Sequence, residues 1–116
     1  MPALTYLKLD NNNLTYLPLK QFTGNPRLEE LNIGNNNLEK LVAYQFPPLL
    51  SLKRLLLGGN SLSQIDPKAF LNLGTSLEEL DLKENRLTTI NEEAVRSLYG
   101  LQVKRRSFVR DLLCSK

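Results

Sequence analysis

The hydrophobic positions of the chain follow one template, which returns four times. Each copy has the form LxxLxLxxNxL, with polar residues at most of the x positions. The copies begin at intervals of 24, 24 and 25 residues, at Leu4, Leu28, Leu52 and Leu77. A fixed period of this length is the signature of a repeat architecture, in which each unit buries its apolar face against its neighbours. The pattern therefore predicts an array of stacked units rather than one central core.

Each copy contains a short stretch in which apolar and polar residues alternate. Alternation with a period of two places the two sets of side chains on opposite faces of a strand. The sequence predicts these strands at Tyr6–Asp10, Glu30–Gly34, Arg54–Gly58 and Glu79–Lys83. Because the connection between them is about 24 residues long, neighbouring strands are expected to pair in parallel. The side chains expected to face the core are Leu7, Leu9, Leu31, Ile33, Leu55, Leu57, Leu80 and Leu82.

An asparagine follows each predicted strand, at positions 12, 36, 60 and 85. Its side chain carries both donors and an acceptor, so it can satisfy backbone groups that a buried turn leaves unpaired. We therefore expect Asn60, for example, to be buried and bonded to backbone. Glycines and the neighbouring asparagines supply residues that tolerate the unusual dihedral angles of such a turn.

The return limb of each unit adds further apolar rows. They are Leu17, Leu41, Ile65 and Ile90; Phe22, Phe46, Phe70 and Val95; and Leu49, Leu73 and Leu98. Prolines interrupt these limbs and argue against long helices. Cap residues followed by proline or acids allow a turn or two of helix at Asp66–Leu71 and Asn91–Leu98.

These residues resemble the "typical" 24-residue subclass of leucine-rich repeats, LxxLxLxxNxLxxLxxxxFxxLxx. The resemblance implies an α/β solenoid, with a parallel sheet on its concave face and short turns, 3-10 or helical pieces on its convex face. It also implies an asparagine ladder and a phenylalanine spine. The subclass is common in Toll-like receptor, Slit-like and small proteoglycan ectodomains, which favours a receptor-like, extracellular protein. The cysteine-rich caps of such proteins are not found, since the chain has a single cysteine.

The two ends of the array differ from its middle. Residues 1–100 hold the four repeats, and residues 101–116 read as a degenerate fifth repeat or a basic tail. Lys104 and Arg106 stand there at leucine positions, while residues 107–113 fit one face of a short capping helix. The first repeat lacks a polar cap. We therefore expect self-association through its bare face, near Leu4 and Leu14.

Charge and composition narrow the possible functions. Residues 1–100 carry ten Lys/Arg and eleven Asp/Glu, whereas residues 101–116 carry five basic residues and one acid, for a total of +3. The repeats are thus nearly neutral, which does not favour a nucleic-acid surface. No apolar run reaches the ~18 residues of a membrane span. Met1 is followed at once by repeat sequence, so no signal peptide is expected.

Catalytic and metal-binding patterns are missing from the sequence. The chain has no histidine, so Cys114 cannot form a Cys–His pair. Neither a metal-ligand cluster nor a phosphate-binding glycine loop is found. Asn13 begins a glycosylation sequon, although an unmodified turn residue is favoured unless the protein is secreted. We expect no enzyme activity, no cofactor and no small-molecule substrate.

The outward residues of the four strands are the candidate binding surface. Leu56 stands among them where a polar residue is expected, and Tyr6 lies two strands away; apolar anchors within a charged rim are typical of interfaces. The alternative is a solvated sheet face of a structural fragment without a ligand of its own. The predicted partner-binding residues are Tyr6, Lys8, Glu30, Asn32, Arg54, Leu56, Glu79, Asp81 and Lys83. The sequence thus predicts a module that binds a protein through its concave face.

Overall fold

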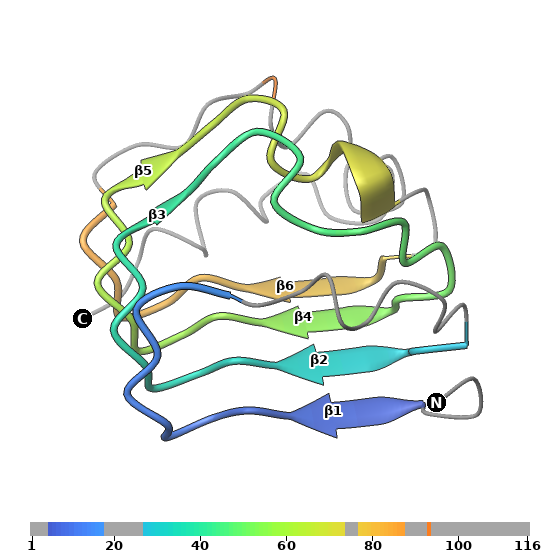
Figure 1. The fold of residues 1–116 in the computed structure, drawn as a ribbon, viewed down its shortest axis with the longest axis horizontal. Helices are drawn as coiled ribbons and strands as arrows, with labels where there is room; N and C mark the ends of the chain where they lie inside the picture. Colours follow the sequence, from blue (N-terminus) through green and yellow to red (C-terminus); the bar gives the residue numbers. More distant parts are fainter. Residues whose placement is uncertain (1–4, 18–26, 74–76, 88–92, 94–116) are drawn as a thin grey trace.

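Four parallel strands form the main sheet of the computed structural model (Figure 1). The structure describes residues 5–17, 27–73, 77–87 and 93. The strands are β1 (Tyr6–Lys8), β2 (Glu30–Asn32), β4 (Arg54–Leu56) and β6 (Glu79–Asp81), and they pair in the order β1-β2-β4-β6. Corresponding residues of successive repeats are partners, as in Leu31↔Leu55 and Leu55↔Leu80. The predicted parallel pairing in chain order is confirmed.

Each strand is three residues long, not the five predicted. The chain leaves the extended direction because one residue after every strand has a positive φ angle. These residues are Asn11, Asn35, Gly59 and Glu84, with φ of 61°, 54°, 76° and 57°. Backbone hydrogen bonds between repeats nevertheless continue through this turn, as in Asn35 N–H to Gly58 O at 2.9 Å.

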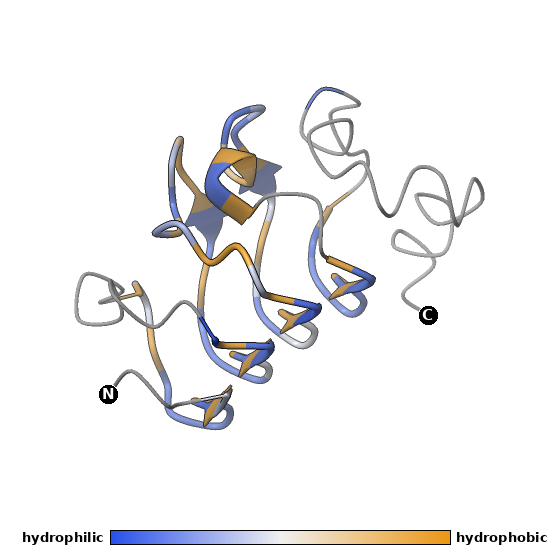
Figure 2. Ribbon diagram, turned by 90° about the vertical axis from the view of Figure 1, so that its right-hand side faces the viewer, coloured by the Kyte–Doolittle hydropathy of each residue, from blue (hydrophilic) through white to orange (hydrophobic). Residues whose placement is uncertain are grey.

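A second layer lies on the return limb (Figure 1). It contains a two-stranded parallel sheet of β3 (Lys40–Leu41) and β5 (Gln64–Ile65), and the 3-10 helix η2 (Leu71–Leu73). The helical piece predicted at Asp66–Leu71 lies mostly later. Asp66 first closes a tight turn, in which its carbonyl accepts from Ala69 N–H and its carboxylate from Lys68 N–H. Figure 2 shows the repeats as successive coils.

The core lies between the two layers and is continuous across the repeats. The inward leucines of β2, β4 and β6, and the inward residues directly after these strands, Ile33, Leu57 and Leu82, are 0–1% exposed. Phe46 stacks on Phe70 with ring centroids 6.1 Å apart. Leu7 and Leu87, at the two ends of the described array, are only partly buried. The predicted inward rows are therefore confirmed in the middle repeats. Phe22, Ile90, Val95 and Leu98 lie outside the described residues.

The asparagine ladder joins each repeat to the one before it. Asn60 is 7% exposed. Its Nδ2 donates to Leu57 O at 2.9 Å and to Ile33 O of the preceding repeat at 3.0 Å, and its Oδ1 accepts from Leu38 N–H at 3.1 Å. Asn36 and Asn85 make the equivalent bonds in their repeats. The expected burial and bonding of Asn60 are confirmed.

Asn12 is the exception on this ladder. It is exposed, and its Nδ2 donates only within its own repeat, to Leu9 O at 2.9 Å and Asp10 O at 3.1 Å. No described residue donates to its Oδ1 in the way that Leu38 donates to Asn60.

Several expectations fall on residues that the structure does not describe. They concern Leu4, most of Asn91–Leu98, and residues 101–116 with Cys114. Among the described residues, no helix is long and apolar enough to cross a membrane.

Replacing Asn60 with alanine is expected to lower the free energy of unfolding by about 1–3 kcal/mol, because buried backbone groups lose their partners. The matched control is Asn12→Ala, which should cost less because water can reach the exposed groups. Urea denaturation of both variants measures the difference. Equal losses would contradict the ladder's role.

Glu84→Asn is expected to raise the free energy of unfolding by about 0.5–1 kcal/mol, because asparagine tolerates the left-handed region better than glutamate does. Glu39→Asn removes the same carboxylate from an exposed site without positive φ and serves as control. If Glu84→Asn is no more stable than this control, the positive φ of Glu84 does not cost stability.

Candidate protein-binding surface

The outer face of the main sheet carries two aligned rows of side chains. Parallel register fixes the rows, because residues at the same repeat position become neighbours on successive strands. The first row is Tyr6, Glu30, Arg54 and Glu79, and the second is Lys8, Asn32, Leu56 and Asp81. We call these eight residues, with Lys83 just after β6, the outer sheet face. The strands thus bring eight of the nine predicted residues to one side of the sheet, and Lys83 follows Asp81 by two residues.

The exposure of these side chains is uneven. Tyr6 is 60% exposed, and Lys8, Arg54 and Glu79 are exposed as well. The sequence predicts that Leu56 is exposed, but the structure shows that it is half-buried. It lies between Asn32 and Asp81 in the second row, so its neighbours cover part of it.

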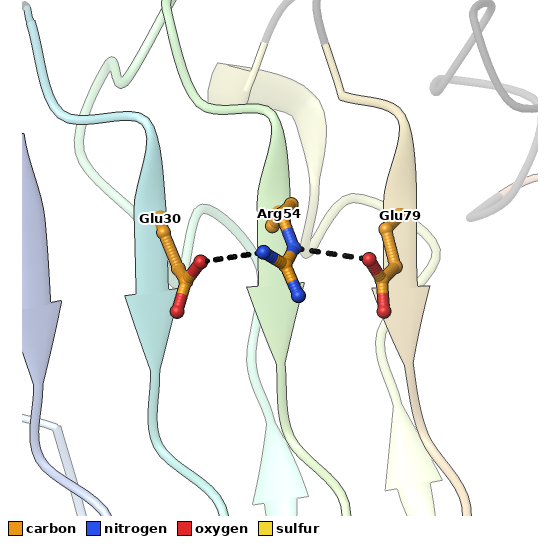
Figure 3. A network of polar contacts seen from close by, with 3 residues as sticks. All are labelled: Glu30, Arg54 and Glu79. Carbon is orange, nitrogen blue, oxygen red and sulfur yellow. Dashed lines mark hydrogen bonds and ion pairs between the residues drawn. The ribbon is translucent and has the colours of Figure 1, made fainter.

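Arg54 lies at the centre of an ion network that spans three strands (Figure 3). Its Nη1 is 3.0 Å from Glu30 Oε1, and its Nε is 3.0 Å from Glu79 Oε1. The Glu30 side chain is 14% exposed, while those of Arg54 and Glu79 are 50% and 49% exposed. Two carboxylates share one guanidinium, so the network has a net charge of −1. The guanidinium is therefore already engaged.

Asn32 and Asp81, the last residues of β2 and β6, accept hydrogen bonds from backbone N–H groups just after their strands. Asn32 Oδ1 accepts from Gly34 N–H at 3.0 Å, and Asp81 Oδ1 accepts from Lys83 N–H at 3.0 Å. Short polar side chains commonly satisfy a backbone donor two residues on. Strand alternation did not predict this role, although an Asn or Asp two residues before the end of the predicted strand was the available signal. Leu56 holds the same position and has no group to make such a bond.

Gly34 and Gly58, two residues after Asn32 and Leu56, leave less open space than their lack of side chains suggests. A Cβ on Gly58 would lie 3.1 Å from Asp81 Oδ2, and a Cβ on Gly34 would lie 3.2 Å from Gly58 O. The carboxylate of Asp81 thus occupies the space above Gly58. Within the described part of the chain, no group of three or more His, Cys, Asp and Glu residues is placed to hold a metal ion.

A comparison with protein families identifies the class. The family model described as leucine rich repeat matches residues 2–62 and 50–103, which together make up most of the chain. The chain belongs to the leucine-rich repeat family, as its period and parallel sheet imply. Domains of this family generally mediate protein–protein interactions. A comparison with curated proteins finds no match.

Arg54→Ala is expected to lower the free energy of unfolding by about 1 kcal/mol at low salt, because it removes two partly exposed ion pairs and leaves two carboxylates near each other. Screening should reduce this loss in about 0.5 M NaCl. Lys53→Ala, which removes the exposed lysine next to it, is the control. A loss that does not depend on salt would show that the network contributes nothing electrostatic.

Proposed function

We propose that this chain is a protein-binding module that contacts its partner through the outer sheet face, the concave face of the solenoid. It acts by surface complementarity and carries out no reaction. The general role of the family supports a protein partner.

The observation that carries the proposal is the fixed arrangement of the outer sheet face. The Glu30, Arg54 and Glu79 side chains hold one another across the strands, and Asn32 and Asp81 are held by backbone N–H groups. A partner that meets such a surface immobilises few additional side chains. Binding therefore costs less conformational entropy than it would on a face of free, flexible side chains.

Leu56 supplies the apolar centre of this surface. It is the uncharged, non-polar member of the second row, and Arg54 precedes it by two residues on the same strand. A half-buried apolar residue surrounded by charged groups fits the arrangement of a binding hot spot and its rim. The charges around Leu56 would orient the partner and speed its approach.

The guanidinium of Arg54 is already paired within the outer sheet face before any partner binds. Its Nη1 and Nε already face carboxylates. We infer that Arg54 orients Glu30 and Glu79, and that the partner meets the outward carboxylate oxygens. The likeness to the 24-residue subclass supports an extracellular, receptor-like setting for this module.

The alternative is a structural segment of a larger extracellular receptor or matrix protein with no ligand of its own. The bonds of Asn32 and Asp81 to their own backbone agree with that alternative too, because they stabilise the sheet without any partner.

Peptides selected from a displayed library against the protein are expected to lose about 1–2 kcal/mol of binding free energy with Leu56→Ala, since truncation of a hot-spot residue removes buried apolar contact. Lys68→Ala, on the return limb, is the matched control and should leave the dissociation constant unchanged. Calorimetry measures both.

Two results would count against the concave face. Selected peptides that lose affinity with Lys68→Ala but not with Leu56→Ala would place binding on the opposite limb. A library that yields no binder would favour the structural segment.

A further inference from the structure

Every later repeat bonds to the strand before it through the same backbone positions. The N–H groups of Glu30, Arg54 and Glu79 donate to carbonyls of the preceding repeat, at 2.9–3.1 Å. The carbonyls of Asn32, Leu56 and Asp81 accept from N–H groups of the preceding repeat, at 2.7–2.8 Å. These two positions therefore face the neighbour on the N-terminal side of each strand.

In β1 the same two positions are Tyr6 and Lys8. The periodicity directs the N–H of Tyr6 and the C=O of Lys8 toward the side where the described part of the chain has no further strand. Because N–H and C=O of one strand residue point to the same side, the C=O of Tyr6 and the N–H of Lys8 lie on this edge as well. With respect to the described residues, the edge thus offers two donors and two acceptors.

The side chains of this strand are also less covered than those of the other strands. Leu7 is only half-buried, whereas Leu31 and Leu55 at the same position are 0% exposed. Tyr6 is 60% exposed. An edge strand with open backbone groups and apolar side chains is a template for pairing with another chain.

We propose that β1 pairs antiparallel with β1 of a second copy of this chain, about a two-fold axis at Leu7. In this register Tyr6 lies opposite the partner's Lys8, and Lys8 lies opposite the partner's Tyr6. Each of these two pairs exchanges both backbone hydrogen bonds, so all four open groups of the edge are satisfied. The two Leu7 side chains become neighbours and cover each other.

We infer that the partner strand comes from a second copy of this chain because the edge of β1 is complementary to itself. A two-fold axis requires the same surface on both copies to match itself. The register at Leu7 meets this condition, because the stem and ammonium group of each lysine lie beside a tyrosine ring. An axis at Lys8 would instead place two lysines directly opposite each other, which is unfavourable. The pairing would continue the main sheet across the interface.

A charge swap at Tyr6 tests the register. Sedimentation equilibrium over a range of concentrations should show a reversible dimer of the unmodified chain. Tyr6→Lys should weaken it roughly tenfold, because two pairs of lysines then face each other. Tyr6→Glu, which removes the same ring but places a carboxylate opposite Lys8, should keep the dimer. Tyr6→Lys combined with Lys8→Glu should restore it. Thermal melts by circular dichroism confirm that each variant is folded.

A cysteine at the axis gives an independent measurement. In a Cys114→Ser background, Leu7→Cys should form an intermolecular disulfide under mild oxidation, because opposed residues of this kind lie about 4.5 Å apart between Cα atoms. Leu9→Cys is the control, since the two copies of that residue would lie about 13 Å apart.

The proposal is overturned if the unmodified chain stays monomeric at the highest concentration. It is also overturned if Tyr6→Lys and Tyr6→Glu weaken the dimer equally, or if Leu9→Cys crosslinks as readily as Leu7→Cys. Tyr6 and Lys8 also belong to the outer sheet face, so the binding of a different partner is measured separately through Leu56 on β4, which the dimer variants leave unchanged.

Discussion

The backbone turn that follows each strand directs some of its carbonyl and N–H groups inward, and these groups find their partners in buried asparagines such as Asn36 and Asn60. An unsatisfied buried donor or acceptor costs about 1–3 kcal/mol, a large part of the stability of a small protein. The side chain of Asn60 serves both its own turn and that of the preceding repeat. The ladder therefore stabilises the stack as well as each turn, because part of its hydrogen bonding requires a preceding repeat.

This requirement explains why the first described repeat differs from the middle ones. Asn12 occupies the ladder position but has no described repeat before it, and it is exposed where Asn36 and Asn60 are buried. Leu7 shows the same effect in the apolar core. The direction of the ladder makes the N-terminal side of each strand the one that awaits a partner. Among the described residues, β1 is the strand of the main sheet that has no repeat on this side.

The features that recur with the period could be predicted from the sequence, because the period encodes them directly. Strand pairing, the inward rows and the bonding of Asn60 all follow from the repeated template. The strand lengths and the pairing of β3 with β5 could not be predicted, since they depend on where the backbone turns. Glu84 illustrates the difficulty: it adopts a positive φ of 57°, because its place in the repeat demands it and not because glutamate favours it.

The candidate site also has features that the sequence predicted and features that it did not. Its nine residues were predicted from strand alternation alone, and the register places eight of them, all but Lys83, on one face. Their contacts were not predicted. The position of Arg54 between Glu30 and Glu79 depends on side-chain conformations across three strands. The bonds of Asn32 and Asp81 to backbone depend on the turn geometry at the strand ends. Alternation predicts on which face of the sheet a side chain lies. Which group that side chain contacts depends on the strand register and on the geometry of the turn.

The third repeat is one residue longer than the two before it, and the place of the extra residue shows how the rows of the outer sheet face stay aligned. Leu52 and Leu77 are 25 residues apart, not 24. Phe46 and Phe70 still stack at the 24-residue offset, and Arg54 is again in register with Glu79. The extra residue is therefore absorbed between Phe70 and Leu77, on the return limb. A surface made of aligned rows needs this separation, because a one-residue slip in the sheet would turn every outward side chain into the core. The return limb can vary in length while the rows of the outer sheet face stay aligned.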